Sequence, residues 1–198
     1  RALLQGFKQA GMTGVGKHFP GHGHVRGDSH HELPVDQRSF EDIEAADLVP
    51  FRRTIDAGLG GVMPAHVIYP SVDSQPAGFS SIWLKEVLRG KLGFGGVVFS
   101  DDLSMEGASV AGGLVERTKA AMAAGCDMAL LCNNPTGADE LLASLNYPMP
   151  AVSLARIARM HGRSLAGGMV ALREDARYHR ALHAIAGVGM RDGELPLG

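Results

Sequence analysis

The sequence predicts an α/β protein built as the C-terminal half of a TIM-type (β/α)8 barrel, followed by C-terminal helices. Short apolar, β-like runs alternate with helical patterns, which is typical of βα units with parallel strands. Each run after the first helix starts within a few residues of a glycine, as it does after the short αβ loops of such folds. The four expected strands cover residues 14–18, 61–66, 96–100 and 128–132.

The length of the chain limits how much of a barrel it can form. A complete barrel needs eight strands and about 250 residues, whereas this chain has 198 residues. We expect residues 1–146 to form a partial barrel and residues 147–198 a helical extension of the same domain. Since the sequence opens within a helical pattern, one interpretation is that the chain is a piece of a longer protein with an upstream half-barrel. Unpaired edge strands favour self-association or pairing with that missing half.

The helical patterns follow the strands in chain order. Residues 2–10 predict a helix that Gly11 ends. A second helix begins near Ser39, a typical N-cap residue, and Pro50 within it predicts a kink or two shorter helices because an interior proline removes a hydrogen bond. Further helices are expected over residues 81–89, 114–124, 152–166 and 169–186.

Composition excludes several classes of partner. Lys and Arg number 19 against 21 Asp and Glu, with no basic block that would bind nucleic acid. No apolar run approaches the roughly 20 residues of a membrane helix. Cys126 and Cys132 form no CxxC motif, so we interpret them as reduced core residues and expect a cytoplasmic protein.

Ionisable side chains gather after the expected strands. Residues 17–31 hold five of the nine histidines, and Asp101 and Asp102 follow another apolar run. The carboxyl ends of parallel strands build the active sites of such folds. Adjacent strand residues point to opposite faces, so one aspartate should face the pocket. A carboxylate there can attack an anomeric carbon, although both acids could instead serve only local structure.

These motifs together resemble a known family. The runs 17–23 and 28–30, KHFPGHG and DSH, are similar to the signature of bacterial β-N-acetylglucosaminidases of glycoside hydrolase family 3. The run 99–105, FSDDLSM, is similar to the nucleophile motif of that family. Residues 63–69 and 125–127 extend the resemblance in the same order. The peptidoglycan-recycling branch is the most similar, because other members usually lack the DSH step.

The resemblance implies a role for each matching residue. Asp101 would be the nucleophile, His30 the general acid/base, and Asp28 its orienting partner, while Lys17 and His18 would bind hydroxyls of the N-acetylglucosamine ring. An imidazole suits the acid/base role because its pKa lies near neutrality. The implied reaction releases N-acetylglucosamine from muropeptides that carry 1,6-anhydro-N-acetylmuramic acid, with retention of configuration. It needs no cofactor and no metal.

Other interpretations stay open at this point. His18, His22, His24 and His30 could ligate zinc with nearby acids, although the helical HExxH spacing is absent. A second alternative is that the pocket is incomplete in this chain, which would then be a catalytically incompetent fragment of the fold. A histidine acid/base carries no fixed negative charge, so phosphorolysis is an alternative to hydrolysis. For His66, ligand contact and plain packing are equally expected.

Overall fold

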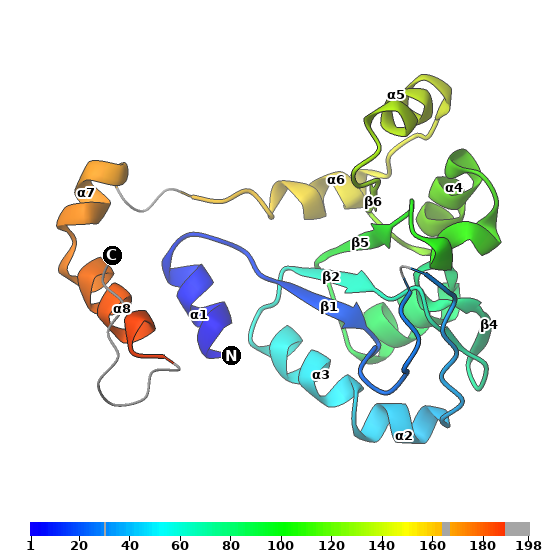
Figure 1. Cartoon of the computed structure of the whole chain (residues 1–198), viewed down its shortest axis with the longest axis horizontal. Coiled ribbons are helices and arrows are strands. Elements are labelled where there is room, and N and C mark those ends of the chain that lie inside the picture. The colour runs from blue at the N-terminus through cyan, green and yellow to red at the C-terminus, as the bar shows by residue number, and fades with distance from the viewer. Residues whose placement is uncertain (30, 164–166, 189–198) are drawn as a thin grey trace.

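The computed structural model describes residues 1–29, 31–163 and 167–188. At its centre lies a four-stranded sheet in the order β1-β2-β5-β6, and all its pairings are parallel. Helices follow the strands along the chain, so the sheet is an arc of a βα barrel and the predicted fold class is confirmed (Figure 1). The strands are Val15–Phe19 (β1), Gly61–Pro64 (β2), Val97–Asp102 (β5) and Met128–Leu130 (β6).

The segment with Pro50 forms two short helices, as predicted. Helix α2 spans Phe40–Ala45 and helix α3 spans Leu48–Asp56. The Ser39 side chain caps α2 by accepting a hydrogen bond from the backbone N–H of Asp42. Pro50 lies in the first turn of α3, where its missing N–H leaves no intrahelical bond unmade. The proline therefore fixes where the second helix begins.

Two further helices cover the sheet. The predicted helix over residues 81–89 is a π-helix, η2 (Ile82–Lys91), and beyond its end the Leu92 N–H donates to the Val87 carbonyl five residues back, at 2.9 Å. Helix α4 spans Leu114–Ala124, as predicted, and ends at Gly125, whose φ is 129°. Such a φ favours glycine.

Several short elements are absent from the sequence-based prediction. Ile68–Tyr69 (β3) and Asp73–Pro76 (β4) form an antiparallel hairpin. Short 3-10 helices and one α-helix complete the set: Ala77–Phe79 (η1), Glu106–Ala111 (η3) and Pro135–Ser144 (α5).

The prediction for the C-terminal helices is wrong in two respects. The helix expected over residues 152–166 is α6, Ala151–Ala158, and residues 164–166 lie outside the described part. The helix expected over residues 169–186 is divided into α7 (Met169–Glu174) and α8 (Ala176–Ala186). The division occurs at Asp175, whose side chain accepts from the Arg177 N–H and starts a new helix.

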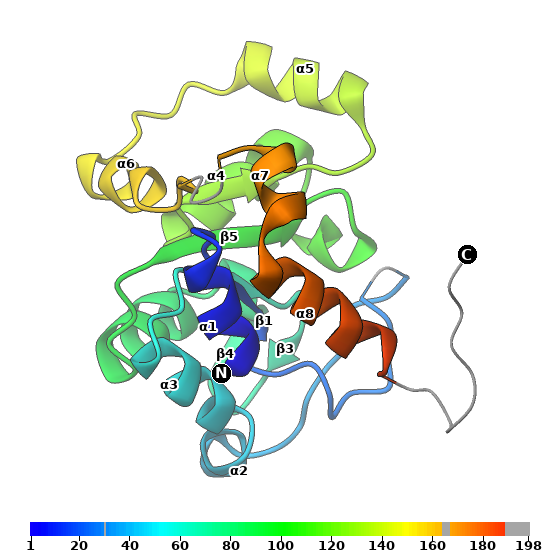
Figure 2. The ribbon, with the colours of Figure 1, turned by 90° about the vertical axis from the view of Figure 1, so that its left-hand side faces the viewer.

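The first and last helices of the described chain lie beside each other. Helix α1 (Ala2–Gln9) lies between the sheet and α8 (Figures 1 and 2). Leu4 of α1 packs against the core and Lys8 donates to the Ala57 carbonyl at 2.6 Å, whereas α8 stands apart from the sheet. Within the described residues, no helix has the length and apolar character to cross a membrane.

An aromatic cluster fills the core directly behind the end of β1. Phe19 is fully buried, and its ring lies 5.3 Å from that of Phe51 and 5.8 Å from that of Trp83. Tyr69 packs against Trp83 at 5.2 Å. Because His18 immediately precedes Phe19, this packing fixes the position of the polar residues at the end of β1.

A buried ionic cluster joins the opposite end of the sheet to the helices. Asp127, which is 1% exposed, accepts from Arg89 Nη2 at 2.7 Å and from Arg156 Nη1 at 3.0 Å. It also accepts from Ser153 Oγ at 2.6 Å and from the Val98 N–H at 2.9 Å. Burial alone would raise the pKa of Asp127, but these hydrogen bonds and the Arg89 charge hold the pKa below its ordinary value.

Candidate active site

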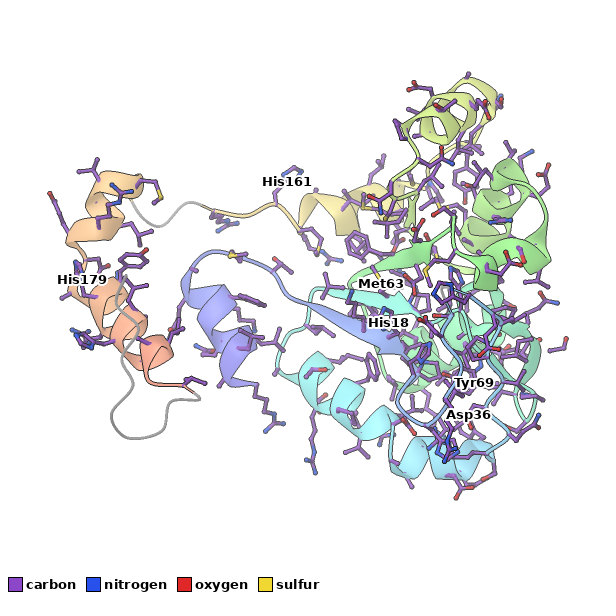
Figure 3. The ribbon with its side chains drawn as sticks, viewed as in Figure 1. His18, Asp36, Met63, Tyr69, His161 and His179 are labelled. Atoms are coloured by element: carbon purple, nitrogen blue, oxygen red, sulfur yellow. The ribbon has the colours of Figure 1, made fainter. Side chains whose placement is uncertain are left out.

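A pocket of about 610 Å³ opens at the carboxyl ends of β1, β5 and β6. Four of the five site residues that the sequence predicts line it: Lys17, His18, Asp28 and Asp101. The fifth, His30, lies outside the described residues. Figure 3 shows His18 at the end of β1, whereas His161 and His179 lie far from it. The other lining residues are His22, Gly23, Ser29, Asp102, Met105, Cys132 and Asn133.

A second hollow, of about 600 Å³, lies between α1 and the helices α7 and α8. Its charged groups are Asp175 and Arg177, which pair with each other at 2.7 Å. The Arg177 side chain is 82% exposed, so this pair is well solvated. The hollow lacks the converging ionisable groups of the first pocket, which is therefore the candidate site.

The centre of the pocket is an acid beside an imidazole. His18 Nε2 lies 3.7 Å from Asp101 Oδ2, and these groups come from β1 and β5, which are separated by β2. Asp101 is 8% exposed, while the His18 side chain is about one-third exposed. Oδ1 of Asp101 accepts from the Asp102 N–H at 2.9 Å, which orients the carboxylate. A fixed, largely buried carboxylate that faces a hollow can act as a nucleophile.

The neighbouring carboxylate has a different set of partners. Oδ1 of Asp102 accepts from the backbone N–H of Ser104 at 2.9 Å and of Cys132 at 3.0 Å. Burial would raise the pKa of Asp102, but these bonds and that of the Ser104 hydroxyl lower it. Asp102 thereby ties the end of β5 to the segment after β6.

The segment that follows β1 and leads to Asp36, called the histidine-rich loop here, is anchored at both ends. At its start, the Tyr69 hydroxyl donates to the Gly21 carbonyl at 2.7 Å. At its end, Arg38 pairs with the buried Asp36 at 2.7 Å and with Asp47 at 2.6 Å. Both anchors, marked by Tyr69 and Asp36 in Figure 3, lie on one side of His18.

The tip of the loop docks through Ser29. Its carbonyl accepts from the Gly107 N–H at 3.2 Å, and its hydroxyl lies 3.2 Å from His22 Nε2. Ser29 is buried, whereas the Asp28 side chain is 59% exposed at the pocket. A Cβ at position 107 would lie 3.1 Å from the Ser29 carbonyl oxygen and 2.9 Å from the Cβ of His66. Glycine is therefore needed at position 107 for the loop to approach this closely.

Sequence reasoning missed some of the pocket wall. Cys132 was expected in the core with Cys126. Cys126 is buried, but the expectation for Cys132 is wrong, because Cys132 is half-buried and lines the pocket. Asn133 lines the pocket too, with a φ of 55° that asparagine tolerates better than most residues. His66, left between ligand contact and packing, is fully buried.

The zinc hypothesis concerned the same loop. Among residues 1–29, 31–163 and 167–188, no group of three or more His, Cys, Asp or Glu side chains has an arrangement that could hold a metal ion. His30, which that hypothesis also invoked, lies outside these residues.

Comparison with known proteins gives consistent matches. The family model described as the glycosyl hydrolase family 3 N terminal domain matches residues 1–160. A Beta-hexosaminidase from Thiobacillus denitrificans is 60% identical over 198 residues, which are 100% of this chain and 55% of that protein. One from Nitrosospira multiformis is 57% identical over 99% of this chain and 56% of that protein.

A solved structure resembles the fold closely. Native NagZ from Neisseria gonorrhoeae has a TM-score of 0.85 and 46% identity, over 96% of this chain and 55% of that one. NagZ has also been solved in complex with N-trifluoroacetyl-D-glucosamine, with a TM-score of 0.83 and 46% identity over 94% of this chain and 53% of that one. The chain spans about half the length of the curated relatives it matches. With most of its residues matched by the family model, the chain belongs to glycosyl hydrolase family 3.

Proposed function

We propose that the protein is a retaining exo-β-N-acetylglucosaminidase that releases N-acetylglucosamine from 1,6-anhydro-N-acetylmuramic acid and its peptides. The observation that supports it most directly is the Asp101 carboxylate, buried and oriented beside His18 in the pocket. The N-acylated glucosamine bound by NagZ supports the choice of sugar. The function belongs to peptidoglycan recycling in the cytoplasm.

In the proposed reaction, Asp101 attacks the anomeric carbon while His30 protonates the leaving oxygen. The bond from the anomeric carbon to the leaving oxygen breaks and an ester to Asp101 forms. His30 then takes a proton from water, whose oxygen displaces Asp101 and releases the sugar. Asp28 holds the His30 ring and stabilises its charged form. Lys17 and His18 bind the ring hydroxyls.

The activity of the whole protein depends on what pairs with the two edge strands of the sheet. Strands β1 and β6 each have one unpaired edge within the described chain, and Val15 and Met128 are 41% and 37% exposed. We propose that an N-terminal half-barrel or a second copy covers them. Assays with a chromogenic N-acetylglucosaminide, on this chain alone and on the protein in its natural form, test the function. No release by the natural protein contradicts it, and turnover by this chain alone excludes the incompetent fragment.

Replacing Asp28 by Asn should lower kcat about 100-fold, because a neutral amide cannot stabilise the charged imidazole that forms during the reaction. The acid/base limb of the pH-rate profile should also move to lower pH, since removal of a negative charge makes the imidazolium easier to deprotonate. An unchanged pH-rate profile would contradict the coupling. Glu32→Gln, an exposed charge in the same loop, is the matched control.

Replacing Gly107 by Ala should lower kcat about 10-fold with the fold intact, because the added methyl displaces the Ser29 docking contact. Steady-state kinetics of the natural protein measure it. Gly95→Ala is the control, since no atom lies within 4 Å of its new Cβ. Equal kinetics in the two variants would show that the docking contact does not matter for turnover.

A further inference from the structure

His66 lies behind the catalytic pocket, just after β2, and is fully buried. Its ring stacks on that of Phe79, with centroids 5.5 Å apart. Nε2 lies 3.1 Å from the backbone carbonyl oxygen of Asp102. Because a carbonyl only accepts hydrogen bonds, Nε2 must carry the proton. The neutral ring then has an unprotonated Nδ1, which has no hydrogen-bond partner among the residues that the structure describes.

The surroundings keep this imidazole neutral. Burial opposes the charged form and lowers the pKa of His66, and the nearby Arg117 charge acts in the same direction. The negative charges of Asp101 and Asp102 act in the opposite direction but do not overcome burial. A second proton would sit on Nδ1, which lies 3.7 Å from where a Cβ of residue 78 would be and has no acceptor among the described residues. His66 is thus a permanent donor through Nε2.

The same residue lies under both catalytic segments. On one side it binds the carbonyl of Asp102, the residue after Asp101. On the other side its Cβ lies 2.9 Å from where a Cβ of residue 107 would be, and Gly107 donates to the Ser29 carbonyl. His66 therefore contacts the end of β5, which carries Asp101, directly, and it is linked to the loop that carries Asp28 through Gly107.

We propose that His66 is a positioning residue for the glycosidase reaction: its neutral ring fixes the backbone turn at Asp101 and supports the docked loop. This inference rests on the proposed function. A fixed donor restricts the carboxylate to one orientation, and reaction rates depend steeply on the placement of the attacking atom.

Two substitutions separate positioning from packing. His66→Met fills the volume without a donor, and kcat of the natural protein should fall about 100-fold while KM changes by less than about threefold. His66→Gln places an amide N–H near the position of Nε2, and kcat should recover to within about 10-fold of the original. Val87→Ala, a core truncation on η2, is the control for lost stability and should keep its kcat.

Equal kcat losses in His66→Met and His66→Gln, or an unchanged kcat in His66→Met, would overturn the positioning role. The proposed function is tested separately by release of sugar from the unsubstituted protein. The ring itself is observed by long-range proton–nitrogen NMR, which needs no turnover. We expect the Nε2–H tautomer and a pKa below the ordinary histidine value, because the ring is buried. A pKa above that value, or a proton carried on Nδ1, overturns the proposal.

Discussion

Replacing Asp101 by Ala should lower kcat about 10⁴-fold or more, because it removes the carboxylate that forms the covalent ester. Its carboxylate is buried and lies 3.7 Å from His18 Nε2 in the pocket. Sodium azide should then restore turnover of an activated glycoside and give the α-glycosyl azide, since the small anion attacks from the side that the carboxylate left empty. Chromatography of the azide product measures this outcome.

Asp102→Ala is the matched control for the nucleophile assignment. Asp102 binds the backbone of Ser104 and Cys132, so its removal should lower the unfolding midpoint more than the chemical rate. Thermal unfolding and kcat are measured on both variants. Equal losses of chemistry in Asp101→Ala and Asp102→Ala, or a β-configured azide product from the first, would contradict the assignment.

Replacing Asp127 by Ala should destabilise the fold by about 3–5 kcal/mol, because it leaves two partly buried guanidinium groups without their counter-charge. Arg89 and Arg156 both pair with Asp127, and their side chains are 15% and 18% exposed. For a chain of this size, the loss corresponds to a Tm lower by about 10 °C. Calorimetry measures it, and Arg177→Ala, in a solvated pair, should change Tm little.

The same cluster predicts how acid acts on the fold. Since the pKa of Asp127 is lowered in the folded state, its contribution is complete above the unfolded pKa of about 3.9 and is lost as pH falls toward the folded value. The stability difference between the natural side chain and Asp127→Asn should therefore shrink below about pH 4. Urea unfolding across this range tests it, and a constant difference would exclude the coupling.

The strands and their polar ends could be predicted because each strand is a short apolar run followed by ionisable residues. The signal was clear at β5, where buried Val97 and Val98 precede Asp101. The hairpin β3–β4 was missed because β3 has two residues and β4 is a short polar segment that ends in a proline. The start of helix α5 is recognisable in the sequence, because Asn134 is a typical N-cap residue and Pro135 occupies the first position of the helix.

The contacts that complete the candidate site join residues far apart in sequence, which a local pattern cannot reveal. His66 binds the Asp102 carbonyl across 36 residues. Ser29 accepts from Gly107, and neither residue type predicts this bond. Motif resemblance assigned roles to Asp101 and Asp28, but it gave no sign of the buried side chain beneath both.

Anchoring the histidine-rich loop at Gly21 and Asp36 has a consequence for how the reaction depends on dilution. The segment between these points is tethered at both ends, so Asp28 is held at the pocket within one molecule. The encounter of Asp28 with the other pocket residues is therefore a first-order event, at a local concentration on the order of millimolar that dilution of the protein does not change.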